Sequence, residues 1–476
     1  MQEGPPWLAS PSYNPFMISI YAQRRAALAA QLGAGGVAII PTAPERARNR
    51  ESDFPYRHDS YFFYLTGFTE PNAWLVVAAN GHSTLFCQPK DLEREIWDGI
   101  RLGPQAAPAA LGVRQAHSVN ELDKELPKLL ENQSTVWFPF ATHEGLTAQM
   151  DGWLTQVRAR VRMGVSCPSS QQDLCTLLDE MRLVKDGHEQ DTMRRAARIS
   201  AQAHMRAMQT SARMLRAGQD VREYHLEAEL LHAFRLHGSQ FPAYTSIVAA
   251  GANACVLHYR ADTAAVRDGE LVLIDAGCEL DGYASDITRT FPANGTFTGP
   301  QKDLYQVVLA AQHASAKATK AGARFNDPHE AALRVLSQGL LDLGLLTLAK
   351  HGSVDDVLEK KAYFPFYMHR TSHWLGMDVH DCGSYVEPGE ANTAPAKADP
   401  LTGVMVQPRP SRVLHAGMVL TLEPGLYVRP SGDVPEAFWN IGIRIEDDAL
   451  VTATGCELIS RDVPVEVSEI EALMAG

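Results

Sequence analysis

The stretch "LVLIDAGCELDGYASDITRTF" (271–291) begins as a buried strand, yet it carries two carboxylates, Asp275 and Asp286. A lone ionised carboxylate in an apolar strand is costly unless something compensates its charge. Between the two acids lies the pair Asp281-Gly282, which is typical of a two-residue hairpin loop of type I′. The stretch therefore predicts a β-hairpin with one acid on each arm.

That loop sets the register, so that Asp275 faces Thr288 and Asp286 faces Gly277. Both acids then point to the same face as diagonal neighbours, with Cβ atoms roughly 7 Å apart. Unshielded, they would repel and raise each other's pKa, whereas a dication between them removes the repulsion. The alternative is that Asp275 caps a turn and Asp286 pairs with Arg289 at the surface.

A second candidate segment is "MHRTSHWLGMDVHD" (368–381). His369 and His373 are four residues apart, the spacing of two ligands on one helical face. However, Arg370 stands where an HExxH motif needs Glu. A three-histidine zinc site that adds His380 stays open, although it leaves the patterned acids unexplained.

Two further strand-like segments carry acids: "TLEPGLYV" (421–428), with Glu423, and "NIGIRIED" (440–447). In the second, Arg444 and Glu446 share the face opposite the isoleucines, by the period of two of a strand. Taken alone, this pair also fits a solvent-facing salt bridge.

The chain contains an internal similarity. "LVLIDAG" (271–277) matches "VLTLEPG" (419–425), and each precedes a second strand-like stretch with another acid, Asp286 or Glu446. The pattern indicates a duplicated half-domain. A pseudo-twofold arrangement would bring the two acid pairs together at its axis.

The combined set is rich in oxygen ligands and consists of Asp275, Asp286, His373, Glu423 and Glu446. Four carboxylates and one imidazole suit Mn²⁺ better than a single zinc ion. Four negative charges match two dications. Metal centres about 3.5–4 Å apart can hold a bridging hydroxide and clamp a scissile carbonyl. We therefore expect two divalent metal ions, most consistent with Mn²⁺.

The whole chain, with 476 residues, is too long for one compact core, so two domains are expected. The formal charge of −13 argues against nucleic acid or an anionic membrane as a partner. No apolar run spans a bilayer and no secretion signal is evident, so a cytoplasmic enzyme is expected. The 7 cysteines are scattered and predict no disulfide framework.

In the first part, strands alternate with helices and predict an α/β domain. The polar stretch "CPSSQQD" (167–173) suggests a linker. A long helix should begin at Asp186, where Glu189 completes a capping box, and a second box is suggested by Asp220 and Glu223.

The five candidate ligands, in this order, resemble the dinuclear metallopeptidase family that contains methionine aminopeptidase, aminopeptidase P and prolidase. The likeness covers nearly the whole chain. The segments that resemble aminopeptidase P are "FPYRHDSYFFYLTGFTEPNAWLVV" (54–77), "EIWDGIRLGPQAAPAALGV" (95–113) and "SHWLGMDVHD" (372–381). The resemblance implies a creatinase-like N-terminal domain (1–178) and an α+β pita-bread catalytic domain (179–476). It also implies removal of an N-terminal residue that precedes proline.

The resemblance also implies roles for residues. Asp275 would hold one metal, Asp286 and Glu446 would bridge both, and His373 and Glu423 would hold the other. Glu423 would also shuttle a proton to the leaving nitrogen. The remaining residues implied are His258 and His380, which orient the substrate and stabilise developing charge, Arg444, which holds Glu446, and His369, Tyr259 and Trp97 as substrate-binding residues.

Trp97 resembles a residue that reaches into a neighbouring subunit's site, so a homodimer or homotetramer is expected. Between His380 and Glu423 the chain looks about twenty residues longer than the commonest aminopeptidase P pattern, and the extra loop lies at about 386–410. This loop leaves an Xaa-Pro dipeptidase open as an alternative. A non-catalytic binding module of the same fold is a more distant one.

Overall fold

This computed structural model describes residues 15–260 and 263–476, and the chain divides after Met181 into two compact units. The predicted boundary between residues 178 and 179 lies close to this division. Each unit has its own buried apolar clusters.

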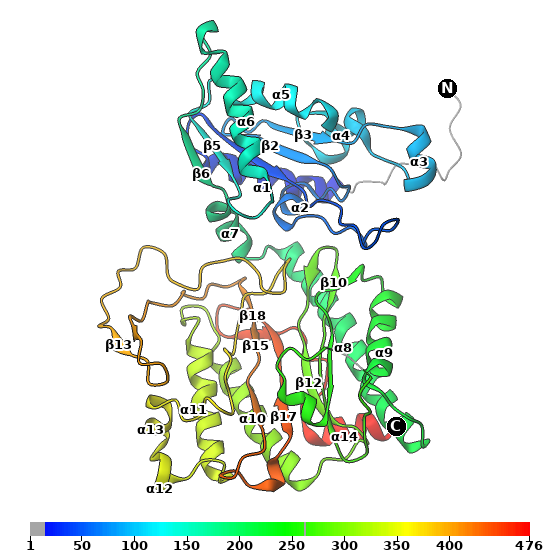
Figure 1. The fold of residues 1–476 in the computed structure, drawn as a ribbon, viewed down its shortest axis with the longest axis vertical. Helices are drawn as coiled ribbons and strands as arrows, with labels where there is room; N and C mark the ends of the chain where they lie inside the picture. The colour runs from blue at the N-terminus through cyan, green and yellow to red at the C-terminus, as the bar shows by residue number, and fades with distance from the viewer. Residues whose placement is uncertain (1–14, 261–262) are drawn as a thin grey trace. The chain divides into compact units, whose positions relative to one another are not determined.

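The first unit is built on one mixed sheet with the strand order β4-β3-β2-β1-β5-β6 (Figure 1). Its strands are β1 (Gly36–Pro41), β2 (Trp74–Ala78), β3 (Ser83–Cys87), β4 (Gln115–Ser118), β5 (Thr135–Phe138) and β6 (Ser170–Asp173). Its helices are α1 (Pro15–Gln31), α2 (Ser60–Thr66), α3 (Leu92–Asp98), α4 (Gly103–Leu111), α5 (Leu122–Leu130) and α6 (Leu146–Ala159), with α7 (Cys175–Leu183) at the division. The expected α/β domain is confirmed.

The linker prediction for residues 167–173 was wrong. Ser170–Asp173 forms β6 and pairs in parallel with β5 at one edge of the sheet. An edge strand exposes much of its length to water and tolerates polar side chains, which made the segment look like a linker.

The second unit contains two helix pairs: α8 packs on α9, and α10 packs on α11. Strands of the unit lie between these pairs (Figure 1). Its helices are α8 (Gly187–Arg216), α9 (Glu223–Leu236), α10 (Gly299–Ala318), α11 (Asp327–Asp342), α12 (Leu348–His351), α13 (Val354–Glu359) and α14 (Val467–Ala475).

The strands of the second unit form small antiparallel sheets. They are β7 (Phe241–Pro242), β8 (Ile247–Ala250), β9 (Leu271–Asp275), β10 (Cys278–Leu280), β11 (Tyr283–Ala284), β12 (Thr288–Pro292), β13 (Lys397–Ala398), β14 (Met405–Val406), β15 (Val419–Leu422), β16 (Gly425–Val428), β17 (Ile441–Arg444), β18 (Asp447–Val451) and β19 (Cys456–Leu458).

The two halves of the predicted repeat have matching layouts. Asp275 ends β9 and Glu423 directly follows β15, while Asp286 precedes β12 and Glu446 precedes β18. β9 pairs antiparallel with β12, and β15 pairs antiparallel with β18. In each half, one acid therefore leaves one strand of a pair and the other acid enters its partner.

The predicted hairpin is confirmed in loop and register. Asp281 and Gly282 have φ values of 51° and 81°, the left-handed region that a type I′ turn needs. Asp275 lies opposite Thr288, as expected. Gly277 is required at its position, because a Cβ there would lie 1.7 Å from the carbonyl oxygen of Ser285 on the facing arm.

The start of α8 follows the predicted capping box: Asp186 accepts from the backbone of Glu189, and Glu189 accepts from that of Asp186. The second predicted box was wrong. Glu223 is fully buried and turns inward to accept from the backbone of Ala250, while Asp220 pairs with Arg222.

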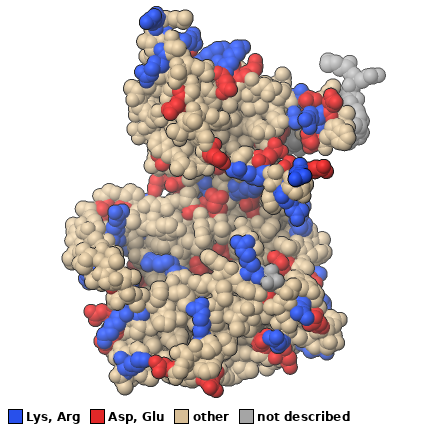
Figure 2. Space-filling view, viewed as in Figure 1, with Lys and Arg blue, Asp and Glu red and all other residues tan. Residues whose placement is uncertain are grey.

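On the face shown in Figure 2, basic and acidic side chains are interspersed. Within the described residues, no helix combines the length and apolar character needed to cross a membrane.

Candidate metal centre and active site

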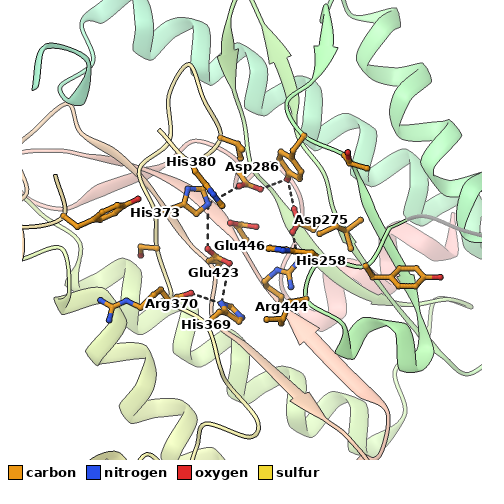
Figure 3. A pocket seen from close by; sticks show the side chains of 18 of the residues that line it. His258, Asp275, Asp286, His369, Arg370, His373, His380, Glu423, Arg444 and Glu446 are labelled. Atoms are coloured by element: carbon orange, nitrogen blue, oxygen red, sulfur yellow. Dashed lines mark hydrogen bonds and ion pairs between the residues drawn. The ribbon is translucent and has the colours of Figure 1, made fainter. Parts of the chain in front are cut away.

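One cavity of about 740 Å³ in the second unit is lined by side chains from segments far apart in the sequence (Figure 3). Of the predicted site residues, this lining contains His258, Tyr259, Asp275, Asp286, His369, His373, His380, Glu423, Arg444 and Glu446. Trp97 is the exception. It lies on α3 of the first unit with 81% of its surface exposed.

Asp275 and Asp286 are joined by a residue that the sequence did not single out, Tyr244. The hydroxyl of Tyr244 lies 2.6 Å from Asp275 Oδ1 and 2.5 Å from Asp286 Oδ1. The two carboxylates therefore converge on one point, as the hairpin register predicted.

Three side chains that could hold a metal ion together lie where the two halves of the repeat meet. Ligand atoms of Asp286, His373 and Glu446 all lie within 4.8 Å of one another. Glu423 extends this group, because its Oε1 lies 3.8 Å from His373 Nε2. Together with Asp275, these are the five residues whose clustering the sequence predicted (Figure 3).

Arg444 is placed differently from the prediction. Its Nη2 donates to Asp275 Oδ2 at 2.5 Å. The carboxylate of Glu446 instead accepts from the Thr288 hydroxyl, which donates to Oε2 at 2.6 Å. Arg444 Nε donates to that same Thr288 oxygen at 3.1 Å. The guanidinium therefore supports Glu446 through Thr288. A strand pattern places neighbouring side chains on one face but cannot show a residue inserted between them from another strand.

The close packing of buried acids raises the pKa of several side chains in the site. Burial raises the pKa of Asp275 against the opposing effect of Arg444, and burial raises the pKa of Glu423 to about 7. Burial and then Asp286 raise the pKa of Glu446 well above its usual value. Burial alone would lower the pKa of His373, but the neighbouring carboxylates outweigh it and raise the pKa to about 9.

These shifts show how well the donor set fits divalent metal ions. Buried carboxylates hold protons only because their charges are neither solvated nor balanced. Dications at the same place would balance the charge and displace those protons. The donors are mostly carboxylate oxygens with a single imidazole nitrogen, the set that hard ions such as Mn²⁺ accept.

The three-histidine zinc site is not formed. His369 uses both ring nitrogens elsewhere, bonding the Arg370 carbonyl at 2.7 Å and the Tyr427 hydroxyl at 2.8 Å. His380 stacks edge-on against His373 with ring centroids 4.3 Å apart. Burial lowers the pKa of His369 to about 3, so His369 is neutral near pH 7, and burial also lowers the pKa of His380.

Tyr259 lines the cavity, but its hydroxyl donates to Glu223 Oε2 at 2.8 Å. The other oxygen of Glu223 accepts from the Ala250 backbone and from Asn253. Glu223 therefore holds both ends of segment 250–259, which carries His258. The sequence carries no signal for this role, because Glu223 fitted a capping pattern.

The alternative in which Asp286 pairs with Arg289 at the surface does not hold. Arg289 is fully buried and pairs with Asp447 at 2.8 Å, and Asp286 is 5% exposed. Asp286 instead faces His373, with its Oδ2 3.3 Å from His373 Nε2.

A buried set of acids and an imidazole in one cavity is typical of metal-dependent hydrolases. Comparison with known proteins gives the family. Residues 191–453 match the model of metallopeptidase family M24, and residues 21–137 match the aminopeptidase P N-terminal domain. The chain belongs to metallopeptidase family M24, and its catalytic unit has the pita-bread fold.

Similar proteins extend over nearly the whole chain. Xaa-Pro aminopeptidase of Escherichia coli is 41% identical over 96% of this chain and 97% of its own. Among solved structures, Pseudomonas aeruginosa aminopeptidase PepP matches with a TM-score of 0.88 and 44% identity, covering 96% of this chain and 98% of the other. A Glu-to-Ala variant of E. coli aminopeptidase P in complex with substrate matches with a TM-score of 0.87 and 40% identity, with the same coverage of both chains.

Proposed function

We propose that this chain is an Xaa-Pro aminopeptidase, a metallo-exopeptidase that uses two Mn²⁺ ions to release the N-terminal residue from peptides with proline in second position. The observation that carries the proposal is the convergence of four carboxylates and His373 in one cavity of an M24 fold. The names of the full-length relatives support the specificity for proline.

In this proposal Asp275 would hold one metal, Asp286 and Glu446 would be shared by both, and His373 and Glu423 would hold the other. The contacts among Asp286, His373 and Glu446 support the assignment. When bound, the two ions polarise the scissile carbonyl and lower the pKa of a water nucleophile.

Glu423 is the proposed proton carrier. The bond to be broken joins a carbonyl to a proline nitrogen that has no hydrogen of its own, so the nitrogen must gain a proton to leave. A carboxylate can take the proton released by the attacking water and hand it on. The placement of Glu423 Oε2 3.7 Å from His369 Nδ1, at the cavity wall, suits this role.

Two histidines provide donors for the charge that develops on the carbonyl oxygen. His258 and His380 are both exposed to the cavity, where an N–H can reach a substrate oxygen. His369 binds substrate beside Glu423. Arg444 holds Asp275 directly and Glu446 through Thr288, and so keeps the acids in place.

The decisive test compares three peptides at saturating Mn²⁺: Ala-Pro-Ala, the dipeptide Ala-Pro, and Ala-Ala-Ala. We expect turnover of Ala-Pro-Ala to exceed that of the other two by at least about 100-fold, the selectivity that a site built around one residue type can reach. Strict preference for the dipeptide would replace the aminopeptidase with the dipeptidase.

The dipeptidase is the second candidate because the extra loop at 386–410 lies next to the cavity. The bridge between Val386 and Ser411 closes the base of the loop, and Tyr385, directly before it, lines the cavity. A loop in this position can limit the length of the peptide that enters.

We further propose that the enzyme works in the cytoplasm as a homodimer or homotetramer, with Trp97 supplied to a neighbouring subunit's site. Its 81% exposure in the single chain supports this. A non-catalytic binding module is the remaining alternative. Metal-free protein that regained no activity with Mn²⁺ would favour it over the enzyme.

A further inference from the structure

Arg370 is a cation on the wall of the active-site cavity without an acidic partner. The side chain is exposed, lines the cavity and lies next in sequence to His369. Among the described residues, no carboxylate pairs with it. Within residues 15–260 and 263–476, the side chain it bonds is that of Asn326, whose Oδ1 accepts from Arg370 Nη2 at 2.5 Å. Arg444, the other guanidinium that bonds a side chain in this cavity, is by contrast buried and paired with Asp275.

The neighbours of Arg370 hold it in place. Asn326 directly precedes α11, and Phe325 before it packs edge-on against Tyr385 with ring centroids 4.8 Å apart. Arg324, one residue earlier, pairs with Glu390 of the extra loop at 2.7 Å. The partner of Arg370 is therefore fixed to the wall of the cavity.

The main chain and the side chain of Arg370 lie on different sides with respect to the acids. Its carbonyl accepts from His369 Nδ1, and that nitrogen is 3.7 Å from Glu423. Figure 3 shows the side chain extending the other way, away from Glu423 and the remaining acids. The main chain of Arg370 thus lies beside the acids, while its charge lies farther from them and is exposed.

A peptide substrate brings an anion to that position. The first residue of the peptide must lie beside the proposed metal ligands, because its carbonyl is the one that reacts. The carboxylate of a dipeptide's own proline is separated from the scissile nitrogen by one carbon and stays near Glu423. One more residue moves the carboxylate outward by about 3.3–3.6 Å in an extended chain. A guanidinium binds such a carboxylate through two parallel hydrogen bonds.

Building on the proposed function, we propose that Arg370 binds the C-terminal carboxylate of a tripeptide Xaa-Pro-Yaa, so that free tripeptides are the preferred substrate class. Acids at the bottom of the cavity and a cation on its outer wall match a peptide whose charged end is carboxylate and lies outward. The extra loop helps to position Asn326 for this contact. Its Glu390 pairs with Arg324, and Tyr385, directly before the loop, packs on Phe325.

The experiment compares Ala-Pro-Ala with its C-terminal amide in the wild-type chain, in Arg370→Gln and in Arg370→Lys. The wild type should have a KM about 5- to 10-fold lower for the acid than for the amide, the size of one charge-assisted hydrogen bond in a partly exposed site. Arg370→Gln should remove this difference by raising the KM of the acid, with kcat little changed. Arg370→Lys should restore part of it, because the charge returns without the paired geometry.

Arg260→Gln is the matched comparison, because Arg260 is another exposed arginine that lines the same cavity. If Arg370 makes a specific contact, Arg260→Gln keeps the preference for the acid over the amide. An equal loss of that preference in both variants would show a general effect of cavity charge and overturn the proposal.

Two other results would also overturn it: a wild type that does not distinguish acid from amide, or an Arg370→Gln variant in which both substrates weaken equally. In either case hydrolysis of the amide would leave the proposed aminopeptidase function standing. If the wild type with Mn²⁺ cleaved neither tripeptide, the proposed function and this inference would both be wrong.

Discussion

The hydroxyl of Thr288 donates a hydrogen bond to Glu446 Oε2 at 2.6 Å, which links the two halves of the repeat. Thr288 begins β12 of the first half, and Glu446 precedes β18 of the second. Arg444 donates to the same hydroxyl, so one buried oxygen connects a proposed bridging ligand to the guanidinium that holds Asp275.

Thr288→Val should weaken Mn²⁺ binding by about 10- to 100-fold, the usual effect of losing a residue that orients a metal ligand. The measurement is calorimetric titration of metal-free protein with Mn²⁺. Thr290→Val is the control, because Thr290 is equally buried on the same strand but its hydroxyl bonds the backbone of Arg444 and no metal ligand is among its partners in the described residues. Equal Mn²⁺ affinities in the two variants would contradict the role of Thr288.

Tyr244→Phe tests the contact between the two acids of the hairpin. Its hydroxyl lies within hydrogen-bond distance of both Asp275 and Asp286, and both carboxylates lose this hydrogen-bond partner without it. We expect kcat/KM on Ala-Pro-Ala to fall by about 10- to 100-fold. Tyr305→Phe serves as control, since that hydroxyl bonds the Val465 carbonyl away from the cavity and its loss should cost only about 1 kcal/mol of stability.

Asp286→Asn and Glu446→Gln should each lower activity by more than about 100-fold, because they remove proposed bridging ligands. Both replacements keep the side-chain volume, so the chain should still fold. Circular dichroism and metal content by mass spectrometry check these points. Near-normal rates in either variant would be incompatible with the bridging assignment.

Because His204 is buried, we expect the free energy of unfolding to decrease in mild acid. The side chain is fully buried, and its Nε2 bonds the carbonyl of Ala276 at 2.8 Å. Burial lowers its pKa from 6.5 to about 4, so the unfolded state binds a proton first as the pH falls. The stability is fully present above about pH 6.5 and is lost as the pH falls towards 4.

The contribution of His204 to the free energy of unfolding of the protein should drop by roughly 2 kcal/mol between pH 7 and pH 5. Urea unfolding at the two pH values measures it. His204→Gln keeps an N–H donor but does not titrate, so it should remove that part of the pH dependence. The same pH dependence in wild type and variant would assign the effect to other groups.

The extra loop should limit substrate length. Replacing residues 391–408 with a short Gly-Ser linker keeps the Val386–Ser411 bridge and the Arg324–Glu390 pair, and it removes mostly exposed residues. We expect the ratio of kcat/KM for a hexapeptide over a tripeptide, both with proline second, to rise. An unchanged ratio would mean that the loop does not reach the path of longer substrates.

Much of the site could be predicted because its signals are local. The Asp281-Gly282 turn fixed the register and so the common face of Asp275 and Asp286. The capping box at Asp186 likewise depends on side chains three residues apart. A repeated strand-plus-acid pattern then located the second pair of acids.

The residues that sequence reasoning missed act over long sequence distances. Tyr244 contacts acids 31 and 42 residues away, and Thr288 contacts Glu446 across 158 residues. Glu223 matched a local capping pattern, but burial against β8 decided its contacts. No spacing rule reports such pairs, because packing of separate segments creates them.

The most direct test of the metal centre is an anomalous diffraction map from crystals grown in excess Mn²⁺. Two peaks should lie among the carboxylates of Asp275, Asp286, Glu423 and Glu446, with His373 at one of them. A map without peaks there, with these side chains turned towards solvent, would contradict the central claim that paired dications compensate the buried acids.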